Sequence, residues 1–241
     1  MSQTGGAMLA FVGEVLLGFG VGYIFGAFPT GYFLGWLYGV DVRRHGSGRT
    51  GGSNVLRTVG WGAFSLTVLG DMLKGILPLL LVMHRLAPSS ATAAASALLG
   101  VLVGSNWSIV IAWLVRNDPN LRSPSNIYEA IKDFFARAKA GAGVMATAGA
   151  AVTLYWPTVV PLTITGIMVL ILLKYSSAAS MTVAALYPLV MAYFVLTGEA
   201  PAIYLPMSII VAAIVLYALI PNMKRLRAGT EQKFGQRLPT K

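Results

Sequence analysis

Residues 46–57 combine glycine, hydroxyl and arginine side chains in a pattern that suits phosphate binding. The segment reads Gly-Ser-Gly-Arg-Thr-Gly-Gly-Ser-Asn-Val-Leu-Arg. Glycine adopts a positive φ at little cost, so successive backbone N–H groups can turn toward one point and form an anion-binding nest. Arginine adds a planar fork of donors that matches a phosphate group. The segment therefore predicts a phosphate-binding loop, and the alternative interpretation is a flexible connection between two helices.

Other chemistries fit these residues poorly. Gly46, Gly48 and Gly51 have the spacing of a dinucleotide-binding fingerprint, but that fingerprint lies between a strand and a helix, and here a long apolar run precedes it. The segment lacks the Gly-Lys-Ser/Thr of a P-loop. The chain has two histidines and no cysteine, so a zinc site is not expected. Neither histidine has a serine and a carboxylate at the spacing of a hydrolase triad.

The runs that surround this segment predict an all-α protein of the membrane. The chain has 241 residues, of which 56% are hydrophobic and 11% are charged, and its mean hydropathy is +0.71. Because apolar runs of about 18 residues or more are typical of transmembrane helices, we expect one polytopic membrane domain over residues 1–241 with about seven such helices. Phe28-Pro29 predicts a break in the first run. The expected spans are at residues 8–39, 60–83, 92–115, 181–196 and 204–220, and Trp156-Pro157 divides the run 144–173 into two more.

Small and charged residues inside these runs predict how the helices pack. Gly18, Gly22 and Gly26 recur at every fourth residue, which favours close packing against another helix. Asp71 and Lys74 are three residues apart and so share one helix face. Two interpretations of this pair stay open: an internal ion pair, or a lysine that faces a polar cavity.

The distribution of positive charge predicts the orientation of the chain. Sixteen of the 18 lysines and arginines lie in four polar segments: the glycine segment with the residues before it, an insertion at 116–140, the turn that follows residue 173, and a basic tail at 221–241. Lysine and arginine gather on the cytoplasmic side of membranes, so we expect the N-terminus outside and the C-terminus in the cytoplasm. The net charge of +10 then indicates contact with anionic lipid and not with nucleic acid. Within the insertion, residues 127–137 predict an amphipathic helix at the membrane interface.

Five motifs in order resemble those of the PlsY family of bacterial acyl-phosphate:glycerol-3-phosphate acyltransferases. The motifs are residues 46–57, Asp71-x-x-Lys74-Gly75, Gly104 to Ser108, Tyr175 with Ser177 and Ser180, and Asn222 to Glu231. The resemblance extends from Tyr23 to Phe234 with one gap, and the expected topology agrees with it.

The resemblance implies an active site that lies between the helices and faces the cytoplasm of a bacterial inner membrane. There a hydroxyl of glycerol-3-phosphate would attack the carbonyl of an acyl phosphate and yield lysophosphatidic acid and phosphate. The resemblance implies catalytic roles for Ser47, Arg57, Ser177 and Asn222, and it implies no metal or organic cofactor. Further substrate- or phosphate-binding residues are expected at Gly46, Gly48, Arg49, Gly51, Ser53, Asn54, Lys139, Gly141 and Gly143. The expected partners are these two small substrates and membrane lipid, and the oligomeric state stays open.

The chain departs from the family at several of these positions. Ala142 stands where the family has a lysine, and Leu219 and Ser105 stand where it has histidines. Arg49 replaces an asparagine. Loss of one such donor costs about 10²–10³ in rate, so we expect Arg49 to supply the missing cation, with Lys139 as the second candidate. Two other functions stay open: an inactive or altered-substrate relative that binds phospholipid precursors, and a transporter of a phosphorylated solute, although the chain lacks the inverted repeats of many transporters.

Overall fold

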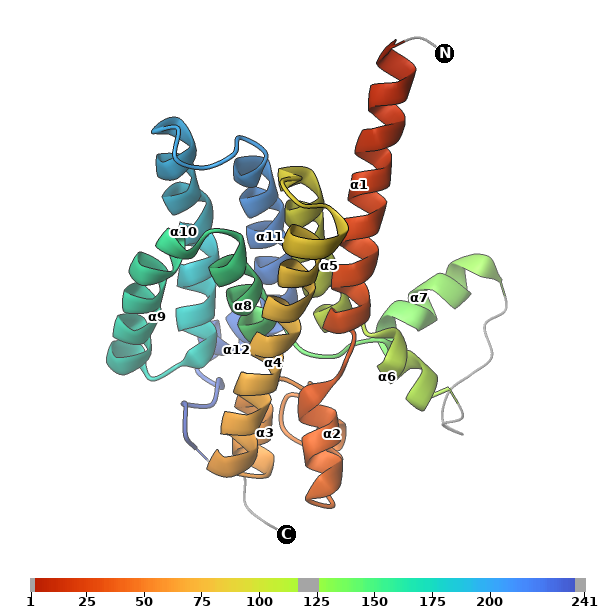
Figure 1. Ribbon diagram of the computed structural model, residues 1–241. Helices are drawn as coiled ribbons and strands as arrows, with labels where there is room; N and C mark the ends of the chain where they lie inside the picture. The colour runs from red at the N-terminus through yellow and green to blue at the C-terminus, as the bar shows by residue number, and fades with distance from the viewer. Residues whose placement is uncertain (1–2, 117–125, 237–241) are drawn as a thin grey trace.

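The computed structural model describes residues 3–116 and 126–236, which form a bundle of helices that stand side by side (Figure 1). The longer helices are α1 (Gln3–Gly26), α4 (Trp61–Leu81), α5 (Ala91–Asn106), α9 (Val159–Leu173), α10 (Ser176–Leu196) and α11 (Tyr204–Ala218). The shorter helices are α2 (Thr30–Leu37), α3 (Gly52–Thr58), α6 (Ile109–Leu114), α7 (Ile127–Arg137), α8 (Val144–Leu154) and α12 (Ile220–Arg227). Single turns occur at η1 (Val42–Arg44), η2 (Val82–Leu86) and η3 (Trp156–Thr158). No strand occurs within the described residues, and this confirms the predicted all-α class.

Helices α1 and α5 pack with their backbones in contact, as the glycine spacing predicts. A Cβ atom on Gly22 would lie 2.0 Å from a backbone carbonyl oxygen of α5. The corresponding distances are 2.1 Å for Gly18 and 2.4 Å for Gly26. No side chain fits at these distances, so these three glycines are what allows the two helices to approach.

A second glycine contact joins α4 to α8. A Cβ atom on Gly75 would lie 2.0 Å from the carbonyl oxygen of Ala146. On the other side of the bundle, α10 packs against both α9 and α11. Fully buried aliphatic and methionine side chains fill the space between these helices, among them Leu79, Leu98, Leu102 and Met191.

The ion pair inside α4 is confirmed. Lys74 Nζ lies 2.9 Å from Asp71 Oδ1. The same ammonium group donates to the carbonyl oxygen of Phe28 at 3.1 Å. The lysine therefore ties α4 to the predicted break between α1 and α2, where α1 ends at Gly26 and α2 begins at Thr30.

Some predicted boundaries are wrong. The run expected at 92–115 is interrupted, because α5 ends at Asn106 and α6 begins at Ile109. Ser108 caps α6 by accepting a hydrogen bond from the N–H of Ile111, which starts a new helix at that point. Helix α10 begins at Ser176 and not near residue 181, so the turn expected at 174–180 is mostly the first part of a helix. The predicted division at Trp156-Pro157 is confirmed by η3.

The composition of the helices shows a multi-pass membrane protein. Among the described residues, four helical segments are long and apolar enough to cross a membrane, or five if α11 and α12, bent by 53°, form one span. Large apolar side chains cover their outer faces, for example Leu196 at 83% exposure and Ile24 at 71%. Helices α5 and α8 have 16 and 11 residues, fewer than the roughly 20 that cross a bilayer core unaided.

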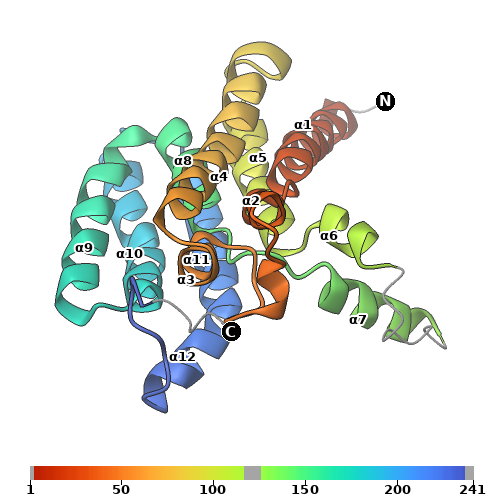
Figure 2. The same ribbon diagram turned by 90° about the horizontal axis from the view of Figure 1, so that it is seen from below.

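Helix α7 projects from the side of the bundle beside α6 (Figure 2). It is the predicted amphipathic helix, with the predicted bounds. Its apolar side chains are largely uncovered, as Ile127 is 78% exposed and Ile131 is 53% exposed. Residues 117–125 of the insertion and 237–241 of the tail lie outside the described residues.

Candidate active site

Asn54, in the first turn of α3, holds the glycine loop (residues 46–51) in shape. Its Nδ2 donates to the carbonyl oxygens of Val42 at 2.7 Å, His45 at 3.1 Å and Arg49 at 2.8 Å. Its Oδ1 accepts from the backbone N–H of Ser47 at 3.1 Å. The residue is 2% exposed. Because the amide group is occupied by the loop itself, Asn54 positions the loop, and the N–H of Ser47 points at Asn54 and not outward.

The loop lies against a second glycine segment, the glycine turn (residues 140–143), which follows α7. A Cβ atom on Gly51 would lie 3.9 Å from the Cα of Gly141. Gly48 and Gly143 have φ values of +68° and +66°, which few other residues adopt. The glycines that were expected to bind phosphate thus also bring two segments of backbone together.

Arg49 connects the loop to two distant parts of the chain. Its Nη2 donates to the carbonyl oxygen of Ala218, at the end of α11, at 2.7 Å. Its Nη1 lies 3.5 Å from the carbonyl oxygen of Gly141 in the glycine turn. The guanidinium group is therefore held between the turn and the junction of α11 with α12.

A second cluster forms around Glu231, where α10, α12 and the tail meet. The Oε1 of Glu231 accepts from Ser177 Oγ at 3.1 Å and from Asn222 Nδ2 at 2.9 Å. Its Oε2 accepts from Arg225 Nε at 2.7 Å. Arg57 reaches this cluster from α3 and donates to the carbonyl oxygen of the residue after Glu231 at 3.0 Å. The Glu231 side chain is 2% exposed, so it acts as the centre of the cluster.

Positive charge dominates both clusters. Burial lowers the pKa of Arg49, and the charge of Arg225 lowers it further. Burial also lowers the pKa of Lys139, and the charges of Arg49 and Arg225 add to this effect. Burial lowers the pKa of Arg57 as well. Burial would raise the pKa of Glu231, but the hydrogen bonds from its three partners outweigh burial and hold its pKa below the usual range. Cations that depress one another's pKa are stabilised by a bound anion.

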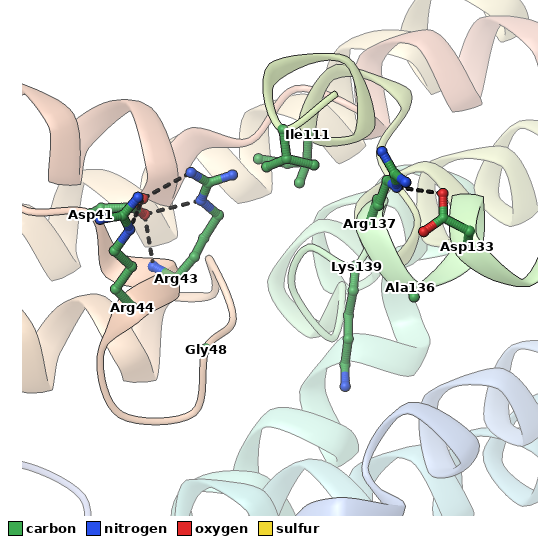
Figure 3. Close-up of a pocket in the computed structure, with 10 residues that line it drawn as sticks. Asp41, Arg43, Arg44, Gly48, Ile111, Asp133, Ala136, Arg137 and Lys139 are labelled. Atoms are coloured by element: carbon green, nitrogen blue, oxygen red, sulfur yellow. Dashed lines mark hydrogen bonds and ion pairs between the residues drawn. The ribbon is translucent and has the colours of Figure 1, made fainter. Parts of the chain in front are cut away.

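A cavity of about 360 Å³ opens between η1 and α7 (Figure 3). On one side Arg43 and Arg44 pair with Asp41. Across the cavity Arg137 pairs with Asp133. The two aspartates thus offset part of the charge of these three arginines within the cavity wall.

A second cavity, also of about 360 Å³, lies on the other side of Lys139. Arg49 and Lys139 line it, and none of the described residues in its wall is a carboxylate. Its two cations therefore have no carboxylate partner within the wall, which makes it the better candidate for an anionic ligand.

The expected site residues lie in two parts of the structure, the Glu231 cluster and the second cavity. Arg57, Ser177 and Asn222 meet at Glu231, whereas Arg49, Lys139 and Gly141 lie at the second cavity or beside it. Ser53 joins the two halves, since its Oγ lies 3.1 Å from that of Ser176.

Sequence reasoning missed Glu231 and Arg225 as members of the site. Glu231 is the sole acidic residue in the tail at 221–241. A lone carboxylate among basic residues was the available signal, because it predicts a specific partner.

Comparison with known proteins identifies the family. The glycerol-3-phosphate acyltransferase family matches residues 16–114 and 131–229. A glycerol-3-phosphate acyltransferase of Rubrobacter xylanophilus is 35% identical over 224 residues, which cover 93% of this chain and 96% of that protein. Glycerol-3-phosphate acyltransferase 2 of Moorella thermoacetica is 37% identical over 229 residues, with 92% and 98% covered.

The chain belongs to the glycerol-3-phosphate acyltransferase family. It is thus a membrane acyltransferase. A crystal structure of PlsY (YgiH), an integral membrane glycerol 3-phosphate acyltransferase, in its glycerol 3-phosphate form, has the same fold, with a TM-score of 0.71 at 23% identity over 91% of this chain and 95% of that chain. A second structure of PlsY, in a lysophosphatidic acid form, has a TM-score of 0.69. The family match is interrupted at residues 115–130, an interval that overlaps the insertion expected at residues 116–140.

Proposed function

We propose that this acyltransferase moves an acyl group from an acyl phosphate to glycerol-3-phosphate at the cytoplasmic end of a seven-span bundle in a bacterial inner membrane. A hydroxyl oxygen of glycerol-3-phosphate bonds to the acyl carbon, and the bond from that carbon to the phosphate oxygen breaks. The hydroxyl proton ends on the released phosphate, and lysophosphatidic acid is the other product. Two anions must be held together, so cations and N–H donors have to form the site.

The observation that carries this proposal is the convergence of positive side chains from segments far apart in sequence. Arg49 lies in the glycine loop and Arg57 in α3. Lys139 directly precedes the glycine turn, and Arg225 lies in α12. Each of the first three has a pKa that is lowered by burial and, in addition, by the charge of Arg225. Two phosphate groups would neutralise this excess of charge.

Within the site, we assign the catalytic contacts with substrate to Ser47, Arg57, Ser177 and Asn222. Arg57 supplies a bidentate fork for phosphate. Ser177 and Asn222 are oriented by the Glu231 carboxylate. The further phosphate-binding groups are Gly46, Gly48, Gly51, Ser53, Gly141 and Gly143, and Asn54 acts by positioning the loop that carries the first of them.

Arg49 takes the place of the lysine that the family has at the position of Ala142. Its guanidinium group contacts the carbonyl oxygens of Gly141 and Ala218. These two residues immediately precede Ala142 and Leu219, the positions at which the chain lacks a lysine and a histidine. Three departures from the family pattern are therefore neighbours in space, which supports a compensating exchange.

A transfer assay with purified protein, acyl phosphate and labelled glycerol-3-phosphate tests the proposal. We expect transfer by the wild type, its loss in Arg49→Ala, and partial recovery when Ala142→Lys is added. Absence of transfer by the wild type would mark the chain as an inactive or altered-substrate relative. Full activity in Arg49→Ala would reject the compensating role and leave Lys139 as the cation.

The orientation is tested separately with single cysteines in the otherwise cysteine-free chain. The glycine loop, the start of α10 and α12 lie at one end of the bundle, and the α10–α11 connection lies at the other (Figure 1). We expect Ser47→Cys and Ser177→Cys to be shielded from an impermeant thiol reagent in intact cells, and Glu199→Cys to be labelled. Labelling at residue 47 from outside would overturn the topology.

A further inference from the structure

The tail beyond Glu231 is attached to the bundle by an aromatic cluster of three rings, Trp61, Phe64 and Phe234. Trp61 begins α4 and Phe64 lies three residues later, whereas Phe234 lies in the tail. The centroid of the Phe234 ring lies 5.7 Å from that of Trp61 and 5.7 Å from that of Phe64, and both pairs meet edge to face. The Trp61 and Phe64 rings meet in the same way at 5.6 Å. Edge-to-face contacts are favourable, so the aromatic cluster fixes the tail at Phe234.

The backbone of Phe234 is joined to the turn before α10. Its N–H donates to the carbonyl oxygen of Lys174 at 2.7 Å. Three residues away on each segment, Glu231 accepts a hydrogen bond from Ser177 Oγ at 3.1 Å. Residues 231–234, here called the strap, therefore run antiparallel to residues 174–177 and meet them at both ends. Figure 2 shows the tail returning from α12 toward the start of α10.

The middle of the strap is held by α3. Arg57 Nη2 donates to the carbonyl oxygen of Gln232 at 3.0 Å. Gly60 joins α3 to α4 with a φ of +128°, and its N–H donates back to the carbonyl oxygen of Val55 at 3.1 Å. This tight junction therefore holds the strap at two points, through Arg57 and through the aromatic cluster that Trp61 begins.

The strap needs an anchor because it carries a buried charge. The Glu231 side chain is 2% exposed, and a carboxylate regains favourable hydration when its segment moves into water. Its partner Arg225 is 36% exposed and can follow it outward. The apolar contacts of Phe234 oppose this movement. Three residues reach no more than about 10 Å, so a fixed Phe234 confines Glu231.

We propose that Phe234 is a positioning residue for acyl transfer, held by the aromatic cluster. Through the strap it keeps the Glu231 carboxylate where it orients Ser177 and Asn222. This inference rests on the proposed function, because that function assigns substrate contacts to Ser177 and Asn222. None of the three rings lines either cavity described above, so the aromatic cluster acts through Glu231 and not by contact with substrate.

The test measures the KM of each substrate, with palmitoyl phosphate as the acyl donor. We expect Phe234→Ala to raise the KM for glycerol-3-phosphate about tenfold, the effect of losing about one hydrogen bond, and to leave the KM for the donor unchanged. Partial unfolding of a variant lowers the amount of active enzyme and so the apparent kcat, but it changes neither KM. Phe234→Leu should restore most of the wild-type behaviour, because leucine refills the apolar contact.

Two more variants separate the aromatic cluster from general packing. Trp61→Ala should raise the same KM, and adding it to Phe234→Ala should change little, because both substitutions remove one contact. Phe33→Ala is the matched control, since it removes a phenyl ring from another group of rings, with centroids 6.2 Å from Phe28 and 6.0 Å from Trp36. An unchanged KM for glycerol-3-phosphate in Phe234→Ala, an equal rise in Phe33→Ala, or an equal rise in the KM for the donor would overturn the positioning role.

Hydrogen exchange keeps the positioning role testable if the wild type transfers no acyl group, an outcome that counts against the proposed function alone. Glu231 ties α12 to the strap through Asn222 and Arg225. Release of Glu231 in Phe234→Ala should therefore speed backbone amide exchange over α12, whereas Phe33→Ala should keep the wild-type rates there. Equal exchange over α12 in the two variants would overturn the role of Phe234, whatever the transfer assay shows.

Discussion

The substitution Asn54→Asp tests whether one side chain sets the shape of the glycine loop. It replaces the amide nitrogen with an oxygen that faces the carbonyl oxygens of Val42, His45 and Arg49, at 2.7 to 3.1 Å. The amide nitrogen carries two hydrogens, which it shares among these three acceptors. Loss of these two donors costs about 1 kcal/mol each, and the buried carbonyl of Val42 adds a desolvation cost of about 1–3 kcal/mol. The expected loss of about 3–5 kcal/mol is a large part of a typical stability of about 5–15 kcal/mol.

The stability lost in Asn54→Asp should depend on pH and should be smaller in acid. A protonated carboxyl group can donate one hydrogen bond to these carbonyl oxygens, whereas the charged form repels them. The pKa of the introduced group is therefore higher in the folded protein than in the unfolded chain. Such a group contributes stability that is present below its unfolded pKa and is lost as the pH rises through its folded pKa. The difference in the free energy of unfolding between the variant and the wild type should therefore be smaller at acidic pH and larger toward neutral pH.

The assay is thermal unfolding of the purified protein in detergent, followed by tryptophan fluorescence over a range of pH. Asn126→Asp is the control, because Asn126 Oδ1 caps α7 by accepting a hydrogen bond from the N–H of Glu129 at 2.9 Å, and aspartate caps a helix equally well. A stable Asn54→Asp protein that has lost affinity for glycerol-3-phosphate would refute the positioning role and make Asn54 a ligand of the substrate.

Three further outcomes are expected. Arg57→Ala should abolish the binding of glycerol-3-phosphate in calorimetry and Arg57→Lys should restore it only in part, because lysine lacks the bidentate fork; unchanged binding would make this arginine structural. Gly22→Ala should destabilise the protein by about 1–3 kcal/mol, since its Cβ would lie 2.0 Å from the carbonyl oxygen of Ala97, whereas Gly20→Ala, with nothing within 4 Å, should not; equal melting temperatures would contradict the packing. The pKa of Glu231 is lowered, so its contribution is present above its unfolded pKa and is lost as the pH falls through its folded pKa. Glu231→Gln should lower stability at neutral pH and reduce the loss of stability that occurs as the pH falls. An unchanged loss of stability in acid would show that another group titrates there.

Local patterns in the sequence determined the class of the protein and several of its helix boundaries. Hydropathy identified the membrane class, because the bilayer requires apolar side chains and internally satisfied backbones wherever the chain crosses it. Proline placed the breaks at Phe28-Pro29 and Trp156-Pro157, and periodicity placed α7 at residues 127–137. Glycine spacing predicted the contact of α1 with α5 without naming the partner helix.

Tertiary structure decided what the charged and polar side chains do. Arg49 and Ala218 are 169 residues apart, yet a hydrogen bond of 2.7 Å joins them. Whether Asn54 holds a loop or a ligand, and whether Glu231 has any partner, depends on which segments the helix crossings bring together. Hydrophobic periodicity is a property of a single helix and can therefore be read directly from the sequence. The site is built from the glycine loop, the glycine turn and α12, and these segments meet only after the helices have packed.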